Sequence, residues 1–141
     1  MATFNKFQNF VEDLGKKVHD FRAAGDTLKI YLSNATPDAA LDAVKADLAE
    51  ISAGNGYTAG GPDMQNDMTE TGGTATVTGV DATITASGGS IGPFRYAVLY
   101  NDTPVSPADP LIGWWDYGSA ITLLDGEALT LDVGASLFTI T

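Results

Sequence analysis

One serine and one histidine are the residues that could support nucleophilic catalysis. Ser90 lies in Gly88-Gly89-Ser90-Ile91-Gly92, which matches the G-x-S-x-G pattern around the nucleophile of serine hydrolases. That pattern requires a strand before the serine and a helix after it, whereas here Pro93 and an apolar, strand-like segment follow. The only histidine, His19, lies far upstream instead of downstream. We therefore predict no nucleophilic centre at Ser90 and no enzymatic activity.

Metal and cofactor chemistry is also poorly represented. The chain has no cysteine and a single histidine, so a zinc or copper site is not expected. Asp63, Asp67 and Glu70 lie in one acidic stretch but lack the spacing of a calcium-binding loop. Residues 54–59 loosely follow the glycine spacing of a dinucleotide-binding loop, but an expected helix precedes them where a strand is required. We predict neither a metal nor a cofactor.

The charge balance restricts the class of partner. The 141 residues include 18 acidic and 7 basic side chains, which gives a formal net charge of −11. So few lysines and arginines cannot build the phosphate-neutralising surface that nucleic-acid binding needs, and an anionic membrane surface is disfavoured for the same reason. No apolar run is long enough to span a bilayer. We expect no nucleic acid and no membrane among the partners.

Both tryptophans lie side by side in residues 106–122, a segment with the character of a β-strand. Because side chains alternate between the two faces of a strand, Trp114 is expected beside Ile112 on one face. Trp115 shares the other face with Gly113 and Tyr117, which together form a flat aromatic platform. We therefore predict that Trp114 belongs to the core and that Trp115 is offered to a partner.

Two helices are expected in the first third of the chain. Apolar residues recur at spacings of three and four over residues 4–21, which predicts an amphipathic helix that crosses the chain's own sheets or docks on a neighbouring subunit. Thr36-Pro37-Asp38 has the residue types of a helix start and Gly54 those of a stop, which predicts a second helix over residues 37–52. We assign residues 1–25 to an N-terminal helical arm and residues 26–141 to one β-domain that contains the second helix.

The remaining chain is rich in strand and turn signals. After residue 25 the pattern gives about eight short strands, at the spacing typical of a sandwich or jelly roll. Asp125-Gly126 predicts a hairpin between residues 121–124 and 129–133, and Asp116 is expected to pair with Arg95 on a neighbouring strand. The glycine-rich residues 54–73 form a long loop, either adapted to a partner or a plain surface crossover. The predicted fold class is α+β, mainly β, with both helices on a C-terminal antiparallel β-sandwich or jelly roll.

Several phrases of the sequence resemble a group of small virion proteins of tailed bacteriophages. These are GNGYTAGG, GGSIGPFRYAVLYNDTP, DPLIGWWDYGSAITLLDGEALTL and the terminal LFTIT, and the likeness is best over residues 88–141. The resemblance implies a non-enzymatic component of the phage particle. A capsid decoration or cement protein fits it best, and a tail-associated protein is the alternative. It supplies no catalytic signature and assigns no binding residue.

These observations lead to a prediction of function and of contact residues. We expect a virion structural protein that binds capsid or other virion proteins, is located in the virion and forms a homo-oligomer, with a trimer as the working assumption. A carbohydrate- or receptor-binding module that uses Trp115, Tyr117 and Tyr57 is the alternative from another class. The residues predicted to contact partners are Phe4, Phe7, Phe10, Tyr57, Trp115 and Tyr117.

Overall fold

The computed structural model describes residues 2–141 as nine strands, one α-helix and one 3-10 helix. The first part of the chain forms β1 (Asn5–Lys6), α1 (Asn9–Gly15), β2 (Leu28–Ser33) and the 3-10 helix η1 (Lys45–Asp47). The remaining strands are β3 (Asp67–Thr71), β4 (Thr74–Thr78), β5 (Ala82–Thr85), β6 (Ile91–Asn101), β7 (Leu111–Leu123), β8 (Ala128–Leu131) and β9 (Phe138–Ile140). The prediction of a mainly β chain is confirmed. Within residues 2–141, no helix has the length and apolar character needed to cross a bilayer.

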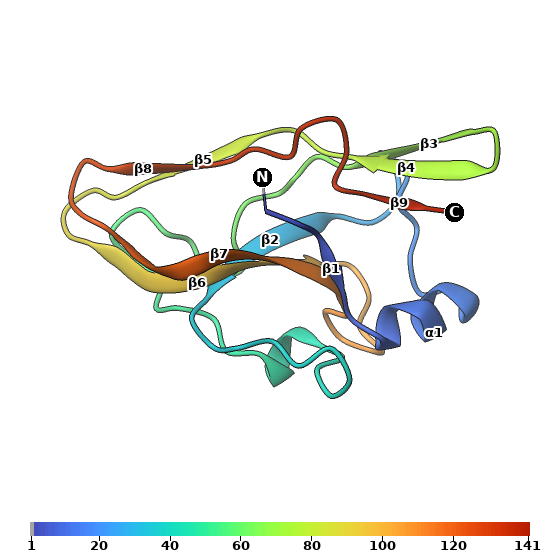
Figure 1. Ribbon diagram of the computed structural model, residues 1–141, viewed down its shortest axis with the longest axis horizontal. Coiled ribbons are helices and arrows are strands. Elements are labelled where there is room, and N and C mark those ends of the chain that lie inside the picture. Colours follow the sequence, from blue (N-terminus) through green and yellow to red (C-terminus); the bar gives the residue numbers. More distant parts are fainter. Residues whose placement is uncertain (1) are drawn as a thin grey trace.

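The strands form three antiparallel sheets. A central sheet has the order β1-β7-β6-β2, and two smaller sheets have the orders β3-β4-β9 and β5-β8. Figure 1 shows both small sheets above the central sheet, so that the molecule has two layers. The long strands β6 and β7 provide the frame because they pair with each other and contribute most of the buried central face.

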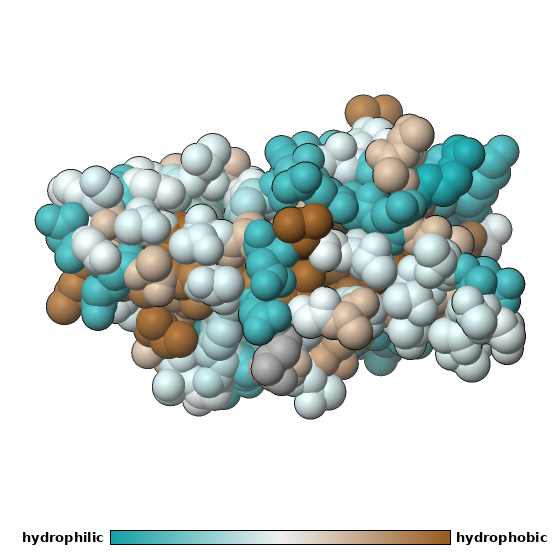
Figure 2. All heavy atoms as spheres, turned by 90° about the horizontal axis from the view of Figure 1, so that it is seen from above, coloured by the Kyte–Doolittle hydropathy of each residue, from teal (hydrophilic) through white to brown (hydrophobic). Residues whose placement is uncertain are grey.

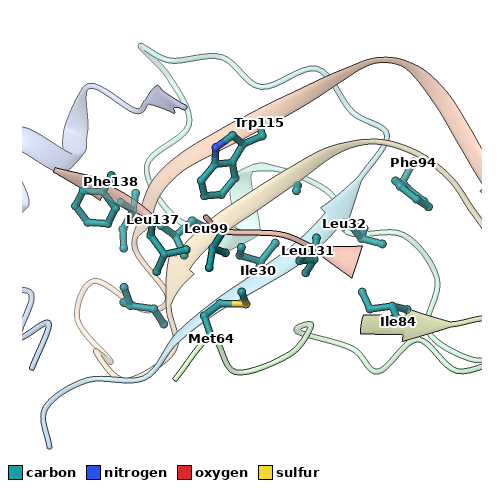
Figure 3. Packing of buried hydrophobic residues seen from close by; sticks show 14 of the residues in the cluster. Ile30, Leu32, Met64, Ile84, Phe94, Leu99, Trp115, Leu131, Leu137 and Phe138 are labelled. Carbon is teal, nitrogen blue, oxygen red and sulfur yellow. The ribbon is translucent and has the colours of Figure 1, made fainter. Parts of the chain in front are cut away.

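The core lies between the two layers. Figure 3 shows Ile30, Leu99 and Trp115 from the central sheet facing Leu131 and Phe138 from the small sheets. Met64 fills the space beneath them although it belongs to no strand. A second cluster covers the opposite face of the central sheet, where Tyr31 and Tyr100 pack against Leu48. Both faces of the central sheet are thus covered by this chain.

The predicted helix over residues 4–21 is wrong in extent, because only Asn9–Gly15 is helical. Residues Asn5–Lys6 pair with β7 instead, which places Phe4 and Phe7 in the two different hydrophobic clusters. The helix ends at Gly15, and Lys17 follows with a left-handed φ of 63°. The three-residue spacing of Phe4 and Phe7 therefore reflects contacts with two faces of a sheet, although it imitates one helical stripe.

The predicted helix over residues 37–52 is also wrong. The Asp38 carboxylate accepts hydrogen bonds from the amides of Ala40 and Leu41, so the helix-start residues form a single turn. After that turn the chain extends, because Val44 forms a bridge with Pro110 and the Lys45 amide donates to the Asp109 carbonyl at 2.9 Å. Only Lys45–Asp47 has helical character, as a 3-10 turn. The segment covers the outer face of the central sheet without forming a helix.

Strand pairing differs from the local pattern of the sequence. The chain turns at Gly126, with φ of 89°, but β8 then pairs with β5 and does not return along β7. The predicted hairpin between residues 121–124 and 129–133 is therefore wrong. Eight strands do follow residue 25, but they include β3 inside the predicted loop 54–73, and β7 joins two of the expected strands.

Candidate interaction surface

The two tryptophans have the reverse of their predicted burial. Leu99 pairs with Gly113 while Tyr100 pairs with Leu111, so Ile112 is an extra residue on β7, which is a β-bulge. The bulge places Ile112 on the same side as Trp115, in the core between the layers, where Trp115 is 3% exposed. Trp114 lies half-buried on the outer face. Trp115 therefore stabilises the core and offers no platform to a partner.

The three N-terminal phenylalanines that were predicted to contact a partner are covered by their own chain. Phe4 is half-buried, with its ring centroid 5.3 Å from that of Trp115 and 5.4 Å from that of Phe138. Phe7 is 0% exposed and lies 4.6 Å from Trp114, on the opposite face of the central sheet. Phe10 is buried against Phe138 at 5.6 Å. The segment thus crosses the β7 edge with Phe4 and Phe10 on one side and Phe7 on the other.

Tyr57 and Tyr117 do not complete an aromatic platform with Trp115. Tyr57 is 3% exposed, and its hydroxyl accepts a hydrogen bond from the Leu32 amide at 3.0 Å. Tyr117 is half-buried against Phe94, with ring centroids 6.0 Å apart. Because two of the three rings are buried, the side chains expected to stack on a sugar do not share an exposed surface.

A nearly buried ion pair fixes the glycine-rich loop that carries Tyr57. Glu50 accepts hydrogen bonds from Lys45 Nζ at 2.7 Å, from the Tyr57 hydroxyl at 2.6 Å and from the Gly60 amide at 2.6 Å. Burial opposes ionisation of Glu50, but these three donors outweigh it and lower the pKa of the carboxyl. Lys45 Nζ also lies 4.9 Å from the Tyr31 ring centroid. The loop is therefore held by polar contacts to its own domain.

The predicted pairing of Arg95 with Asp116 is confirmed. Arg95 Nε donates to Asp116 Oδ1 at 2.8 Å, and Nη2 donates to Oδ2 at 3.1 Å. The two parallel hydrogen bonds link β6 to β7 on a partly exposed surface. The pair contributes to the pairing of these two strands.

The residues considered for catalysis and metal binding lie in separate surroundings. Ser90 is exposed directly before β6, so a strand follows it where a nucleophile elbow needs a helix. Among residues 2–141, no group of three or more His, Asp or Glu side chains is arranged to hold a metal ion. Asp63 and Glu70 instead accept hydrogen bonds from nearby backbone amides, those of Gln65 and Gly73.

His19 lies in a buried polar contact between the N-terminal segment and β6. Its Nδ1 is 3.0 Å from Asn101 Nδ2, an amide nitrogen that also donates to Asp26 Oδ2 at 2.7 Å. Since an amide NH₂ can only donate, Nδ1 is the acceptor and the imidazole proton is on Nε2. Nε2 is buried and has no hydrogen-bond partner among residues 2–141. Burial lowers the pKa of His19 to about 4, against an opposing attraction from the Asp26 carboxylate.

This environment predicts a pH-dependent stability that a single residue controls. The unfolded imidazole titrates near 6.5, so between about pH 6.5 and pH 4 the unfolded chain binds one more proton than the folded chain. The free energy of unfolding should therefore fall as the pH is lowered, by roughly 1–3 kcal/mol after discounting for partial solvent exposure. Urea unfolding at pH 7 and pH 5 measures it. His19→Gln should remove the difference, and an unchanged difference in that variant would assign it to the carboxylates.

Strand β3 is an exposed edge strand. All five residues of β3 are exposed, and only β4 pairs with it in this sheet. Gly72 and Gly73, with φ of 60° and 90°, form the two-residue turn of a hairpin that projects beyond the central sheet (Figure 1). In an antiparallel hairpin, alternate residues direct their amides toward the partner strand, and Thr71 next to the turn is one of these. The amides of Met68 and Glu70 therefore point away from β4. The Met68 amide donates to the Asp67 carboxylate at 2.8 Å, which leaves the Glu70 amide at the open edge.

An apolar hollow of about 500 Å³ lies beside this hairpin. Met68 and Ile140 line it from the small sheet, and Leu14 and Phe21 from the N-terminal segment. Elsewhere the exposed apolar residues are single: Val105 is 88% exposed and Leu41 is 77% exposed. Figure 2 shows the hydrophobic residues of the upper face in small, separate groups among polar ones. The β3–β4 hairpin and the adjoining hollow therefore form the candidate interaction surface.

No protein-family model matches the chain, and comparisons with curated proteins and with solved structures give no match.

Proposed function

We propose that this chain is a structural component of a bacteriophage particle, a capsid decoration protein that binds neighbouring virion proteins and forms a homo-oligomer. The open β3 edge, which offers backbone hydrogen bonds beside an apolar hollow, carries this proposal. The sequence phrases that resemble phage virion proteins fall largely on β6 and β7, so the likeness concerns the frame of the fold. We further propose that the two layers constitute a β-sandwich of the kind used by such proteins.

The charges of β3 indicate which strand it accepts. Asp67 and Glu70 give this edge two negative charges in five residues, within a chain of net charge −11. Acidic side chains on an open edge oppose pairing with a second acidic edge and favour a strand that carries lysine or arginine. Backbone hydrogen bonds from such a strand would supply affinity, and Met68 and the hollow would supply apolar contact. The partner strand is therefore expected to be basic and to come from another virion protein.

Blocking the outward amide of β3 should prevent incorporation of the chain into the particle. Glu70→Pro removes the backbone donor that faces away from β4, whereas Glu70→Ala keeps that donor and removes only the carboxylate. We expect the proline variant to fold but to lose particle binding by at least tenfold, and the alanine variant to bind within about threefold of the original chain. Quantitative mass spectrometry of purified particles measures both. Equal incorporation of the two variants would remove the β3 edge from the proposal.

A further inference from the structure

The N-terminal arm, defined here as residues 2–21, is attached to the rest of the chain through aromatic rings and through backbone hydrogen bonds. Phe4 stacks on Phe138 with an interplanar angle of 11°, and Phe21 meets the same ring edge-on at 5.4 Å. Phe7 occupies the other face of the central sheet against Trp114. All these ring partners in the body come from the last 30 residues of the chain. Because they are distant from the arm in the sequence, the same contacts could be made by the arm of the same chain or by the arm of another copy.

The body has a groove shaped for this arm. Gly113 on β7 pairs with Lys6, and a Cβ atom at Gly113 would lie 2.2 Å from Phe4 Cε2 and 2.5 Å from the Asn5 carbonyl oxygen. The absence of a side chain at position 113 is thus what lets β1 approach β7. The Phe7 amide then donates to the Ile112 carbonyl at 3.1 Å. We call this site at the edge of β7 the Gly113 groove; Trp115 and Phe138 flank it on one face of the central sheet, and Trp114 flanks it on the other.

The connection between arm and body can act as a hinge. Arg22, Ala23 and Ala24 are exposed, and Gly25 follows them before the chain enters the body. Within this linker the Gly25 amide donates to Arg22, and the Ala23 amide donates to Asp67 at 3.2 Å. The turn is also closed by the Asp26 amide, which donates to the Asp20 carbonyl at 2.7 Å, and by the Asp20 amide, which donates to the Asp26 carboxylate at 2.8 Å. The Arg22 guanidinium pairs with the Asp20 carboxylate. Opening the linker therefore breaks these polar contacts, which lie within residues 20–26 apart from the bond of Ala23 to Asp67.

The interface between arm and body is imperfectly packed in the closed chain. The hollow of about 500 Å³ lies along it, with Leu14 and Val18 on the arm side and Met68 and Ile140 on the body side. The unpartnered Nε2 of His19 is buried at the same interface. A hollow and an unsatisfied donor both reduce the free energy that holds the arm in place.

We propose that the arm exchanges between copies of this chain, so that residues 2–21 of one copy occupy the Gly113 groove of another. The exchanged arm makes the same ring and backbone contacts as the closed one, so exchange requires no new complementary surface. The extended linker then joins the two bodies. This inference rests on the proposed structural role, because it names how copies of the chain are tied together.

Cysteine pairing between different chains tests the exchange, since the chain has no cysteine of its own. Asn5 and Trp114 are Cα partners across β1 and β7, at a separation that a disulfide can span. Asn5→Cys and Trp114→Cys would be prepared as full-length single variants, mixed at high concentration and oxidised. We expect covalently linked pairs that contain one chain of each variant, in a fraction that rises with concentration. The matched control is Asn5→Cys mixed with Leu124→Cys, which places the second thiol at an exposed site and should give at least tenfold fewer pairs.

The double variant Asn5→Cys/Trp114→Cys shows whether the disulfide forms within one chain or between two chains. If its disulfide forms only within single chains at every concentration, and the mixed single variants link no more than the control, the arm does not exchange. Deletion of residues 23–25 is an independent measurement, because it shortens the linker by about 10 Å and favours another copy's groove. It should yield folded oligomers by light scattering and near-ultraviolet circular dichroism, and a folded monomer or an unfolded chain would contradict the exchange.

The two proposals can fail separately. Linked pairs of a chain that is missing from phage particles would support exchange and contradict the virion role. Conversely, if the chain is found in particles but the mixed cysteine variants form no disulfide between copies, the virion role is supported and the exchange is contradicted.

Discussion

Trp115→Ala is expected to lower the free energy of unfolding by about 3–5 kcal/mol, the largest effect of any single substitution on β7. Trp115 is 3% exposed and packs in the core between the two layers, with Phe4 covering it from the arm. Removing the indole leaves a cavity that the surrounding strands cannot close. Urea unfolding followed by far-ultraviolet circular dichroism gives the change directly.

Trp114→Ala is the matched control because it removes the same side chain one residue away. Trp114 is half-buried on the outer face, so its loss uncovers Phe7 but leaves the main core intact. We expect about half the effect of Trp115→Ala or less. If Trp114→Ala proves the more destabilising of the two, the β-bulge at Ile112 does not set the faces of β7 as described.

Glu50→Ala is the second substitution with a large expected effect, a loss of about 3–5 kcal/mol. It removes the acceptor for Lys45, for the Tyr57 hydroxyl and for the Gly60 amide at once, and leaves a mostly buried ammonium without its partner. Thermal and urea unfolding measure the loss. Chemical-shift changes at Tyr57 and Gly60 would show that the glycine-rich loop is released.

Two further variants separate burial from charge in this result. Glu50→Gln keeps an acceptor but loses the charge, so its free energy of unfolding should lie between those of the original chain and Glu50→Ala. Glu12→Ala breaks the exposed pair with Lys16 and should cost no more than about 1 kcal/mol. Equal effects of Glu50→Ala and Glu12→Ala would mean that the loop does not depend on the buried pair.

The sequence carried enough information for the strands but not for their partners. Alternation and turn residues indicate a mainly β chain with eight strands after residue 25, because these signals act over a few residues. The turn at Asp125-Gly126 is real, yet β8 crosses to β5 because that pairing closes the second layer over the core. Pairing between strands that are distant in the sequence depends on tertiary packing, and a local hairpin pattern gives no information about that packing.

The burial of the candidate contact residues differs from the expectation for an equally physical reason. Phe4 and Phe7 have helical spacing, but they flank the two faces of one sheet edge, and Phe10 lies in the short helix that follows. The extra residue Ile112 reverses which tryptophan faces the core, and nothing in its residue type signals a bulge. In contrast, the Arg95–Asp116 pair could be predicted because opposite charges lie on two adjacent, well-defined strands. The open edge of β3 depends on which strands pair with it, and its residue types alone do not indicate this.

We propose that the chain, with its aromatic rings covered, joins a phage particle through the open β3 edge. Electron cryomicroscopy of purified phage particles tests this proposal most directly. The predicted result is ordered density for the chain at regular positions, with a basic strand of a neighbouring virion protein paired along Asp67–Thr71. Particles that lack the chain, or that hold it with the β3 edge facing solvent, would contradict the claim.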